Sequence, residues 1–345
     1  MSNEAFWIDE AQADGRVGPA PMPTCGPDEI VVRIRAVSVN PIDKAVQQDG
    51  LFLTEYPAII GVDGAGEVCA VGANVRGYAP GDHVISCFTG MLPPAAEYQK
   101  AAYQRYAVAH PGLSCKLPKS VAFSEAAVLP LAMISAADAL FNTTGMQLSW
   151  PQVPPATPSG KTVVVWGASS SVGSCAVQLL VAAGYTVVAV AGAHNFDLCK
   201  TAGATQVFDH SSPTIVENIA EKLAGDDIAG ILGVIVTEEA LQSVVDLHVK
   251  LRSKGKAGSL VPPHMEIPCK VPEGLTVTKT HCGYVPYEGL ALHLWGEWLP
   301  EAMANGTLKY LPAPVVVGKG LDKIQDAIYR QMKGVSGQKI VIDID

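Results

Sequence analysis

The segment from Thr162 to Ala191 limits the possible folds of this chain more than any other. An apolar run at 162–166 leads into a glycine-containing turn, a helical stretch follows at Val172–Ala183, and a second apolar run, Thr186–Ala191, closes the unit. This order and spacing are typical of a βαβ unit, in which two parallel strands are joined by a helix. The segment therefore predicts a parallel sheet flanked by helices.

The same alternation continues beyond this unit. The further elements that we expect are a helix near Phe196–Ala202, strands at Gln206–Phe208, Ile231–Val236 and Gly258–Val261, and a helix at Glu238–Lys250. Repeated strand and helix patterns favour an α/β fold with a doubly wound parallel sheet of the Rossmann type.

The first 120 residues have a different texture, with many glycines, prolines and short β-type runs such as Ile30–Val37, Gly66–Val71 and His83–Ser86. A helical stretch follows at Ser124–Thr144, and four prolines between Trp150 and Gly160 predict a loop or linker. A helix near Leu321–Met332 and a strand at Lys339–Ile344 end the pattern. Since 345 residues exceed one comfortable core, we expect two domains, a β-rich one (1–125 and 300–345) and the Rossmann one (126–299).

The turn after the first strand of the βαβ unit has the chemistry of a dinucleotide site. A pyrophosphate needs a tight turn, close approach of the backbone and amides at a helix N-terminus. Gly167 and Gly173 supply the turn and the close packing, while the hydroxyls of Ser169–Ser171 either bind phosphate or cap the helix. This turn predicts a dinucleotide cofactor; the alternative is a turn with a structural role alone.

The end of the second strand separates NAD from NADP. An acid there would bind the ribose hydroxyls and repel a 2′-phosphate, but the sequence Val190–Asn195 contains none, and the first acid is Asp197. We therefore expect NADPH, with His194 and Asn195 near the 2′-phosphate. The alternative is that His194 only caps the next helix.

Composition excludes several classes of protein. A net charge of −9 argues against a nucleic-acid partner, and the eight cysteines are too scattered for a zinc knuckle or a CxxC pair. The N-terminus is acidic and lacks a secretory signal, and apolar stretches such as Thr162–Trp166 are too short to span a bilayer. We expect a cytoplasmic protein without a membrane partner.

Four features resemble the fungal trans-acting enoyl reductases of polyketide synthases, of the lovastatin type: Leu131–Asp138, the proline-rich stretch after it, the serines of the cofactor turn and Ala193–Asp197. Five motifs together resemble the wider family, the zinc-independent medium-chain dehydrogenases/reductases of the quinone oxidoreductase type. They are Asn40–Asp43, Gly61–Val68, Gly81–Val84, Gly167–Gly173 and Gly337–Val341. The resemblance implies that the β-rich part is a GroES-like catalytic domain. It also implies the absence of metal, because Val62 and Asp63 stand where zinc-dependent members carry a His-Glu pair.

The resemblance implies roles for particular residues. Asp43 and Lys44 would lie at the nicotinamide end of the cleft, with Lys44 catalytic as enolate stabiliser or proton donor; the alternative for Lys44 is a solvated surface charge. The other residues expected to touch the cofactor are Ser169, Ser170, Ser171, Val172, Gly192, Ala193, His194, Asn195, His210, Val335 and Ser336. Tyr56, Tyr98, Tyr103 and Tyr106 are expected to be packing residues, so that water is left as a proton source.

Two segments would line the substrate-binding site. The alternative for the first segment is an ordinary packed helix. Their residues are Leu131, Ala132, Met133, Ile134, Ser135, Ala136, Ala137 and Asp138, and Thr280, His281, Cys282, Gly283 and Tyr284. His281 and His293 are expected to be structural.

The function implied by the resemblance is NADPH-dependent reduction of the α,β-double bond of a carrier-bound polyketide in fungal secondary metabolism. The implied partner is a polyketide synthase, or a hybrid of one with a peptide synthetase. Two alternatives stay open: a stand-alone NADPH quinone or alkenal oxidoreductase, and a non-catalytic NADPH-binding protein. Prolines between 258 and 290 disfavour pairing through an edge strand, so we expect a monomer.

Overall fold

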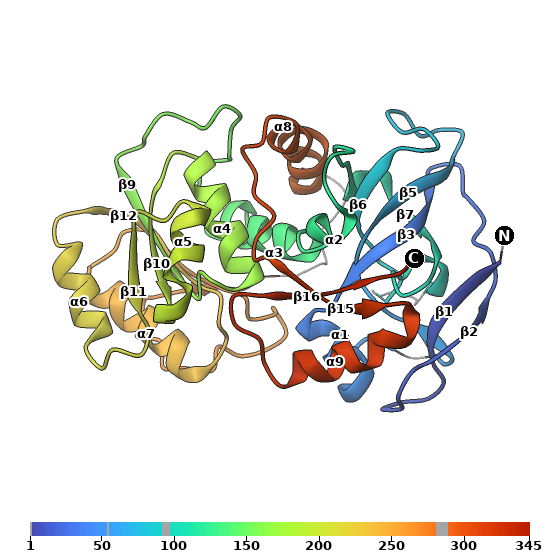
Figure 1. Cartoon of the computed structure of the whole chain (residues 1–345). Coiled ribbons are helices and arrows are strands. Elements are labelled where there is room, and N and C mark those ends of the chain that lie inside the picture. The colour runs from blue at the N-terminus through green and yellow to red at the C-terminus, as the bar shows by residue number, and fades with distance from the viewer. Residues whose placement is uncertain (1, 54, 92–96, 281–288) are drawn as a thin grey trace. The chain divides into compact units, whose positions relative to one another are not determined.

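The computed structural model describes residues 2–53, 55–91, 97–280 and 289–345, and the chain forms two compact units. The first unit comprises Met1–Leu131, Trp295–Gly306 and Ala313–Asp345, and the second comprises Ala132–Leu294 and Thr307–Pro312. Both chain termini belong to the first unit (Figure 1).

The second unit contains a six-stranded parallel sheet with the strand order β11-β10-β9-β12-β13-β14. Its strands are β9 (Lys161–Trp166), β10 (Thr186–Ala191), β11 (Gln206–Asp209), β12 (Asp227–Gly233), β13 (Lys256–Ser259) and β14 (Val277–Thr278). Its helices are α4 (Ser171–Ala182), α5 (Phe196–Ala202), α6 (Ile215–Lys222) and α7 (Glu238–Lys250), with a 3-10 turn at Ala193–Asn195. This strand order is that of the doubly wound Rossmann fold, which confirms the α/β prediction.

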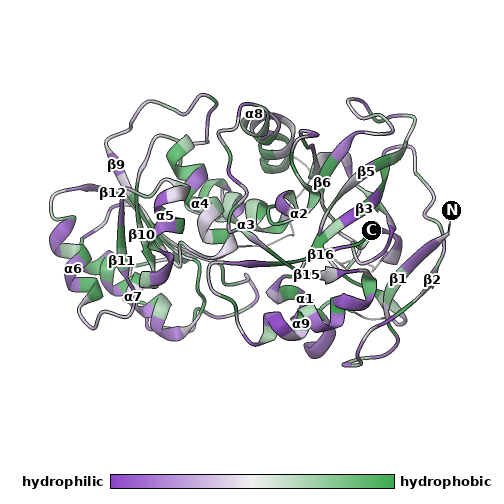
Figure 2. Ribbon diagram, viewed as in Figure 1, coloured by the Kyte–Doolittle hydropathy of each residue, from purple (hydrophilic) through white to green (hydrophobic). Residues whose placement is uncertain are grey.

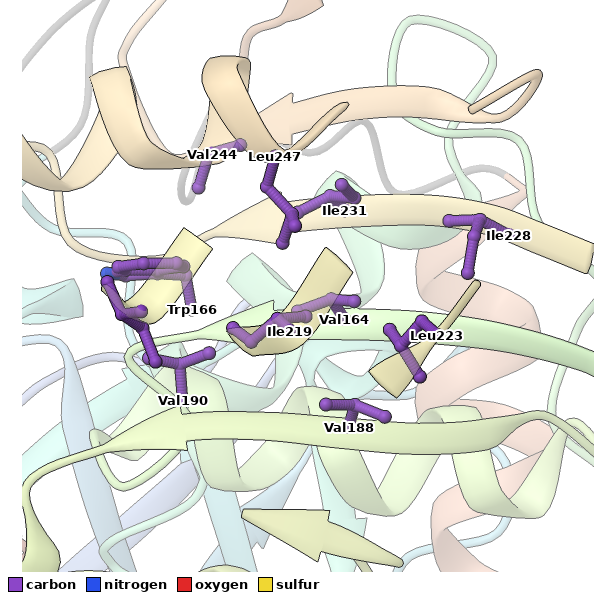
Figure 3. Packing of buried hydrophobic residues seen from close by; sticks show 11 residues of the cluster. Val164, Trp166, Val188, Val190, Ile219, Leu223, Ile228, Ile231, Val244 and Leu247 are labelled. Atoms are coloured by element: carbon purple, nitrogen blue, oxygen red, sulfur yellow. The ribbon is translucent and has the colours of Figure 1, made fainter. Parts of the chain in front are cut away.

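The core of this unit lies between the sheet and the pair α6 and α7. Val164, Val188 and Ile231 of the strands face Ile219 of α6 and Leu247 of α7, and all five side chains are fully buried (Figure 3). Figure 2 shows the apolar strands of the sheet and the polar outer sides of these two helices. An eleven-residue cluster of this kind provides the apolar burial that fixes the sheet.

The first unit is built from antiparallel strands. A seven-stranded sheet has the order β15-β16-β3-β5-β6-β8, with β7 also paired to β3, and only β15 and β16 run parallel; a smaller sheet has the order β2-β1-β4. The strands are β1 (Asn3–Ile8), β2 (Arg16–Ala20), β3 (Ile30–Ser38), β4 (Ala58–Ile59), β5 (Asp63–Val71), β6 (His83–Cys87), β7 (Tyr106–Ala109), β8 (Ser114–Lys116), β15 (Pro314–Lys319) and β16 (Lys339–Asp343). This is the β-rich, GroES-like part of the predicted fold.

Helices of the first unit cover or connect these strands. They are α1 (Pro41–Asp49), α2 (Phe123–Ala126), α8 (Leu299–Ala304) and α9 (Ile324–Met332), with 3-10 turns at Tyr98–Lys100, Pro111–Leu113 and Leu321–Lys323. Helix α3 (Pro130–Phe141) begins in the first unit and continues in the second, and a π-helical segment at Leu292–Trp298 likewise spans the division.

Several element predictions need correction. Strand β12 begins at Asp227 and ends at Gly233, so Ile235 and Val236 of the expected strand 231–236 lie in an exposed loop. Helix α6 was not predicted, because eight residues carry only two turns of amphipathic pattern. The helical prediction at 124–144 is two helices, since Pro130 starts a new one.

The expectation that apolar stretches are too short to span a bilayer also needs correction, because one helical stretch is long and apolar enough to do so. Residues Phe123–Phe141 form a helical stretch of 19 residues with mean hydropathy 1.4, which is sufficient. However, 78% of its apolar window is buried inside the protein. This burial is typical of a core helix, which needs no lipid to cover it.

Candidate cofactor site and buried polar network

The turn between β9 and α4 has the geometry that a phosphate group requires. Gly167 has φ +88°, a conformation that residues with a Cβ rarely adopt. A Cβ at Gly173 would lie only 2.2 Å from the carbonyl oxygen of Gly167, so this glycine permits the close approach of helix and turn. Ser171 and Val172 are the first two helical residues, whose amides have no acceptor within the helix. The turn thus offers amide donors at the positive end of a helix.

The serines of this turn have different tasks. Ser170 caps α4, because its hydroxyl accepts a hydrogen bond from the amide of Gly173 (3.0 Å) and donates one to the carbonyl of Gly167 (2.8 Å). Ser169 accepts a hydrogen bond from the side-chain amide of Asn195 (3.2 Å). Ser170 therefore acts as a helix cap, and Ser171 is half-buried at the helix start; contact of either residue with a phosphate stays a prediction.

Two histidines flank the end of β10. A Cβ at Gly192 would lie 2.9 Å from Cε1 of His194 and 3.6 Å from Nε2 of His210, so both imidazoles lie beside this glycine. Both histidines are exposed, as is Ala193. The N-cap residue of α5 is Asn195, and both the expected 2′-phosphate contact of His194 and its alternative role at the helix start stay predictions. A hydrogen bond from the Ser211 amide lowers the pKa of Asp209, and the nearby His210 and His194 side chains have a smaller effect in the same direction.

Ile235 was missed by the sequence reasoning. A Cβ at Gly167 would lie 2.6 Å from Cγ1 of Ile235, so this side chain packs against the turn. The assignment of residues 231–236 to a strand hid this position. An exposed Ile-Val pair directly before the N-cap Thr237 was the available signal.

In the first unit, Asp43 belongs to a buried polar network. Its side chain is 0% exposed, and its Oδ2 accepts hydrogen bonds from the Asn40 amide (2.7 Å) and the Tyr103 hydroxyl (2.9 Å). Burial raises the pKa of Asp43 to about 7. The expected contact of Asp43 with cofactor stays a prediction; its Oδ2 is occupied by these two donors, whereas its buried Oδ1 has no hydrogen-bond partner among the described residues. Tyr103 fills space as expected and in addition donates a hydrogen bond.

Asp63 is the centre of the same network. It accepts hydrogen bonds from the Ser38 hydroxyl (2.8 Å), the Asn40 side-chain amide (2.8 Å) and the Leu131 backbone amide (2.7 Å). The ammonium group of Lys339 lies 3.2 Å from its Oδ2. Lys339 was quoted from the sequence only as part of a motif; a lysine at the start of the apolar run 340–342 was the signal for a buried cation.

Lys44 lies on α1, directly after Asp43. Its side chain is 36% exposed and forms an ion pair with Asp49 at 2.8 Å. Val335 is half-exposed and Ser336 exposed in the loop before β16. All three belong to the first unit, and their contact with a cofactor bound at the second unit stays a prediction.

The segments expected to line a substrate are largely enclosed. From Ala132 to Asp138 every residue is buried, and only Leu131 is partly exposed. Thr280 is 0% exposed and its hydroxyl donates to the Ser259 carbonyl at 2.6 Å. His281, Cys282, Gly283 and Tyr284 lie outside the described residues. The alternative of a packed helix fits the burial of 132–138, and the substrate role stays a prediction.

The described residues contain a cavity but no cluster of metal ligands. Within the described ranges no three His, Cys, Asp or Glu side chains gather as a metal site would require. A cavity of about 320 Å³ in the first unit contains none of the predicted site residues; it is lined by Arg35, Glu67, Phe123, Ser124, Asp343 and Asp345.

Comparison with known proteins defines the class of this chain. Residues 26–136 match the alcohol dehydrogenase GroES-like domain, and residues 171–280 match the zinc-binding dehydrogenase domain. The chain belongs to the medium-chain dehydrogenase/reductase family of oxidoreductases, as the sequence motifs indicated.

Fungal relatives cover nearly the whole chain. It is 34% identical to the dehydrogenase orsE of Emericella nidulans, over 99% of each chain. It is 35% identical to the trans-enoyl reductase himH of Aspergillus japonicus, over 100% of this chain and 98% of that one. A crystal structure of an alcohol dehydrogenase superfamily protein from Novosphingobium aromaticivorans shares the fold, with a TM-score of 0.77 at 22% identity over 99% and 100% of the two chains.

Proposed function

We propose that this chain is an NADPH-dependent, zinc-independent enoyl reductase that acts in trans on an acyl thioester held by the carrier domain of a fungal polyketide synthase, alone or fused to a peptide synthetase, in the cytoplasm. The observation that carries enoyl reduction is the full-length similarity to himH, a protein named for that activity. The family membership supports the oxidoreductase class.

The residues of the second unit fit a dinucleotide. The turn Gly167–Gly173 would hold the pyrophosphate at the amides of Ser171 and Val172. His194 and His210 would face the 2′-phosphate, at the strand end where an acid would repel it. When bound, NADPH supplies the hydride that reduces the β-carbon of a thioester-conjugated alkene.

The protein's own contribution is orientation and charge. Lys44 carries a positive charge on α1 and would stabilise the substrate enolate or protonate its α-carbon, with water as the other proton source. Lys44→Ala is therefore expected to lower turnover by tenfold or more. A variant with unchanged turnover would remove Lys44 from the mechanism.

Zinc independence is supported by the environment of Asp63. Its Oδ2 accepts from Ser38 and Asn40 and faces the ammonium group of Lys339, and its Oδ1 accepts from the Leu131 amide, so both oxygens are engaged by donors of the protein itself. The expected result is a purified protein without stoichiometric zinc and with activity that withstands a chelator. Metal analysis by mass spectrometry measures both the content and its loss.

One kinetic experiment tests the activity itself. Stopped-flow oxidation of NADPH is followed with α,β-unsaturated thioesters of increasing chain length, free and presented by a carrier domain, and with a free quinone. Turnover of the thioesters supports the proposal. Turnover of the quinone alone indicates a stand-alone quinone reductase, and tight NADPH binding without any turnover indicates a non-catalytic protein; either result contradicts it.

We also propose that the protein is a monomer. Strand β14 lies at one end of the Rossmann sheet order and has only two residues, and short edge strands resist pairing with a second copy. Light scattering should give the mass of one chain, and a dimer mass would contradict this.

A further inference from the structure

An ion pair in the first unit is closed off from water. The side chains of Lys339 and Asp63 are 5% and 0% exposed, and Nζ of Lys339 lies 3.2 Å from Oδ2 of Asp63. Lys339 is the first residue of β16 and Asp63 the first of β5. Removing two charges from water is costly, and apolar residues of similar volume often stabilise a fold as well or better. A contribution to stability alone therefore does not explain why this ion pair is buried.

Asn40 connects this ion pair to helix α1. Its side-chain amide donates to Oδ2 of Asp63 (2.8 Å), and its side-chain oxygen accepts from the ammonium group of Lys339. The backbone of Asn40 also exchanges hydrogen bonds with Asp43, from N to Oδ2 (2.7 Å) and from the Asp43 amide to O (3.1 Å). Asn40 is thus held at both ends of its side chain while its backbone starts the helix.

One further contact ties the same place to β16. The amide of Val39 donates to the carbonyl of Ile340 at 3.0 Å, next to both Asn40 and Lys339. Because 299 positions of sequence separate Lys339 from Asn40, the start of α1 is fixed only when β16 joins the sheet beside β3. Lys44 is the fourth residue of that helix, which begins at Pro41.

We infer that Lys339 is a positioning residue: through Asn40 it orients the first turn of α1, and with it Lys44, for the enoyl reduction proposed above, on which this inference rests. Buried charged groups of this kind select one orientation where apolar contacts tolerate several. The simplest competing role for the Lys339 ammonium group is direct binding of a cofactor phosphate. That role predicts a different response to substitution.

The first test needs no activity. Hydrogen exchange measured by mass spectrometry on the peptide covering 40–50 should be at least fivefold faster in Lys339→Met than in the natural protein. Lys323→Met is the control, since Lys323 is a half-exposed lysine of the same unit whose side chain forms an ion pair with its neighbour Asp322. Unchanged exchange in Lys339→Met would overturn the inference.

The second test uses kinetics with the unsaturated thioester. Lys339→Met should lower kcat about tenfold and leave the Kd for NADPH unchanged, and the double variant with Lys44→Ala should be no slower than Lys44→Ala alone, because the two residues act through one group. Multiplied losses, or a raised Kd for NADPH, would contradict positioning. If the natural protein does not reduce thioesters, the proposed function fails and the exchange measurement alone decides.

A second variant covers the case in which Lys339→Met does not fold. Asn40→Ala keeps the side chains of Lys339 and Asp63, removes the Asn40 side-chain hydrogen bonds to both, and replaces the N-cap residue of α1. It should reproduce both the faster exchange and the lower kcat. Exchange equal to that of the natural protein would exclude Asn40 as the connection.

Discussion

The Tyr103 hydroxyl donates a hydrogen bond of 2.9 Å to the carboxylate of Asp43, and both side chains are 0% exposed. Burial raises the pKa of Asp43 from 3.8 to about 7, against the opposing effects of the Asn40 amide and Tyr103. Burial and the neighbouring Asp43 raise the pKa of Tyr103 well above its ordinary value. A carboxyl group that holds its proton near neutral pH is thus built into the start of α1.

Asp43 makes stability depend on pH. The folded protein binds a proton at Asp43 that the unfolded chain releases above about pH 4, so stability is full below that pH and falls as pH rises toward 7. The slope is at most about 1.4 kcal/mol per pH unit. Asp43→Asn keeps an acceptor for Tyr103 and removes the titration, so its free energy of unfolding should fall less between pH 5 and pH 7.

Urea unfolding at several pH values measures this difference. Glu10→Gln, at an exposed acid of the same unit, is the control and should follow the natural protein. Parallel profiles for Asp43→Asn and the natural protein would show that Asp43 ionises at its ordinary pH.

Gly173→Ala should disrupt the cofactor turn. The added Cβ would lie 2.2 Å from the Gly167 carbonyl oxygen, a backbone atom that cannot move alone. We expect loss of NADPH binding by calorimetry, with a loss of about 1 to 3 kcal/mol in stability. Gly26→Ala meets only the flexible carboxylate of Glu29 and should bind NADPH normally; equal binding by both variants would contradict the assigned turn.

Ser170 and Ser171 should separate stability from cofactor binding. Ser170→Ala removes the cap of α4 and should cost about 1 kcal/mol, seen as a lower Tm of the free protein. The Ser171 side chain forms no hydrogen bond within the part of the chain that the structure describes, so Ser171→Ala should leave that Tm unchanged while weakening NADPH binding. A lower Tm for Ser171→Ala together with weaker NADPH binding by Ser170→Ala would mean that Ser171 caps the helix and Ser170 contacts the cofactor.

His194 and His210 should select NADPH over NADH. Replacing either by Ala removes a donor beside the position proposed for the 2′-phosphate, and a charge-assisted hydrogen bond of about 1.4 kcal/mol corresponds to a tenfold change in Kd. Calorimetry should show weaker NADPH binding and unchanged NADH binding. Equal losses for both cofactors would place the imidazoles elsewhere, and equally tight binding of NADH and NADPH by the natural protein would contradict NADPH preference.

The sequence by itself determined the Rossmann unit and its phosphate turn. The apolar periodicity of its strands and helices and the glycines at 167 and 173 are local features. Such features determine the backbone geometry of a few residues at a time. It also gave the family, because the motifs from Asn40 to Val341 carry its spacing. Shorter elements escaped: α6 is too short for a clear period, and the start of β12 at Asp227 contains weak strand formers.

Only the tertiary structure decided how the polar residues are used. Ser170 as cap, Asp43 as a buried acid and Asn40 as the joint between Asp63 and Lys339 all depend on which atoms lie nearby and how little water reaches them. A lysine and an asparagine 299 positions apart show no common pattern in the sequence. Their pairing arises when β16 closes beside β3, since burial and hydrogen-bond partners are properties of the packed sheet, not of the local chain.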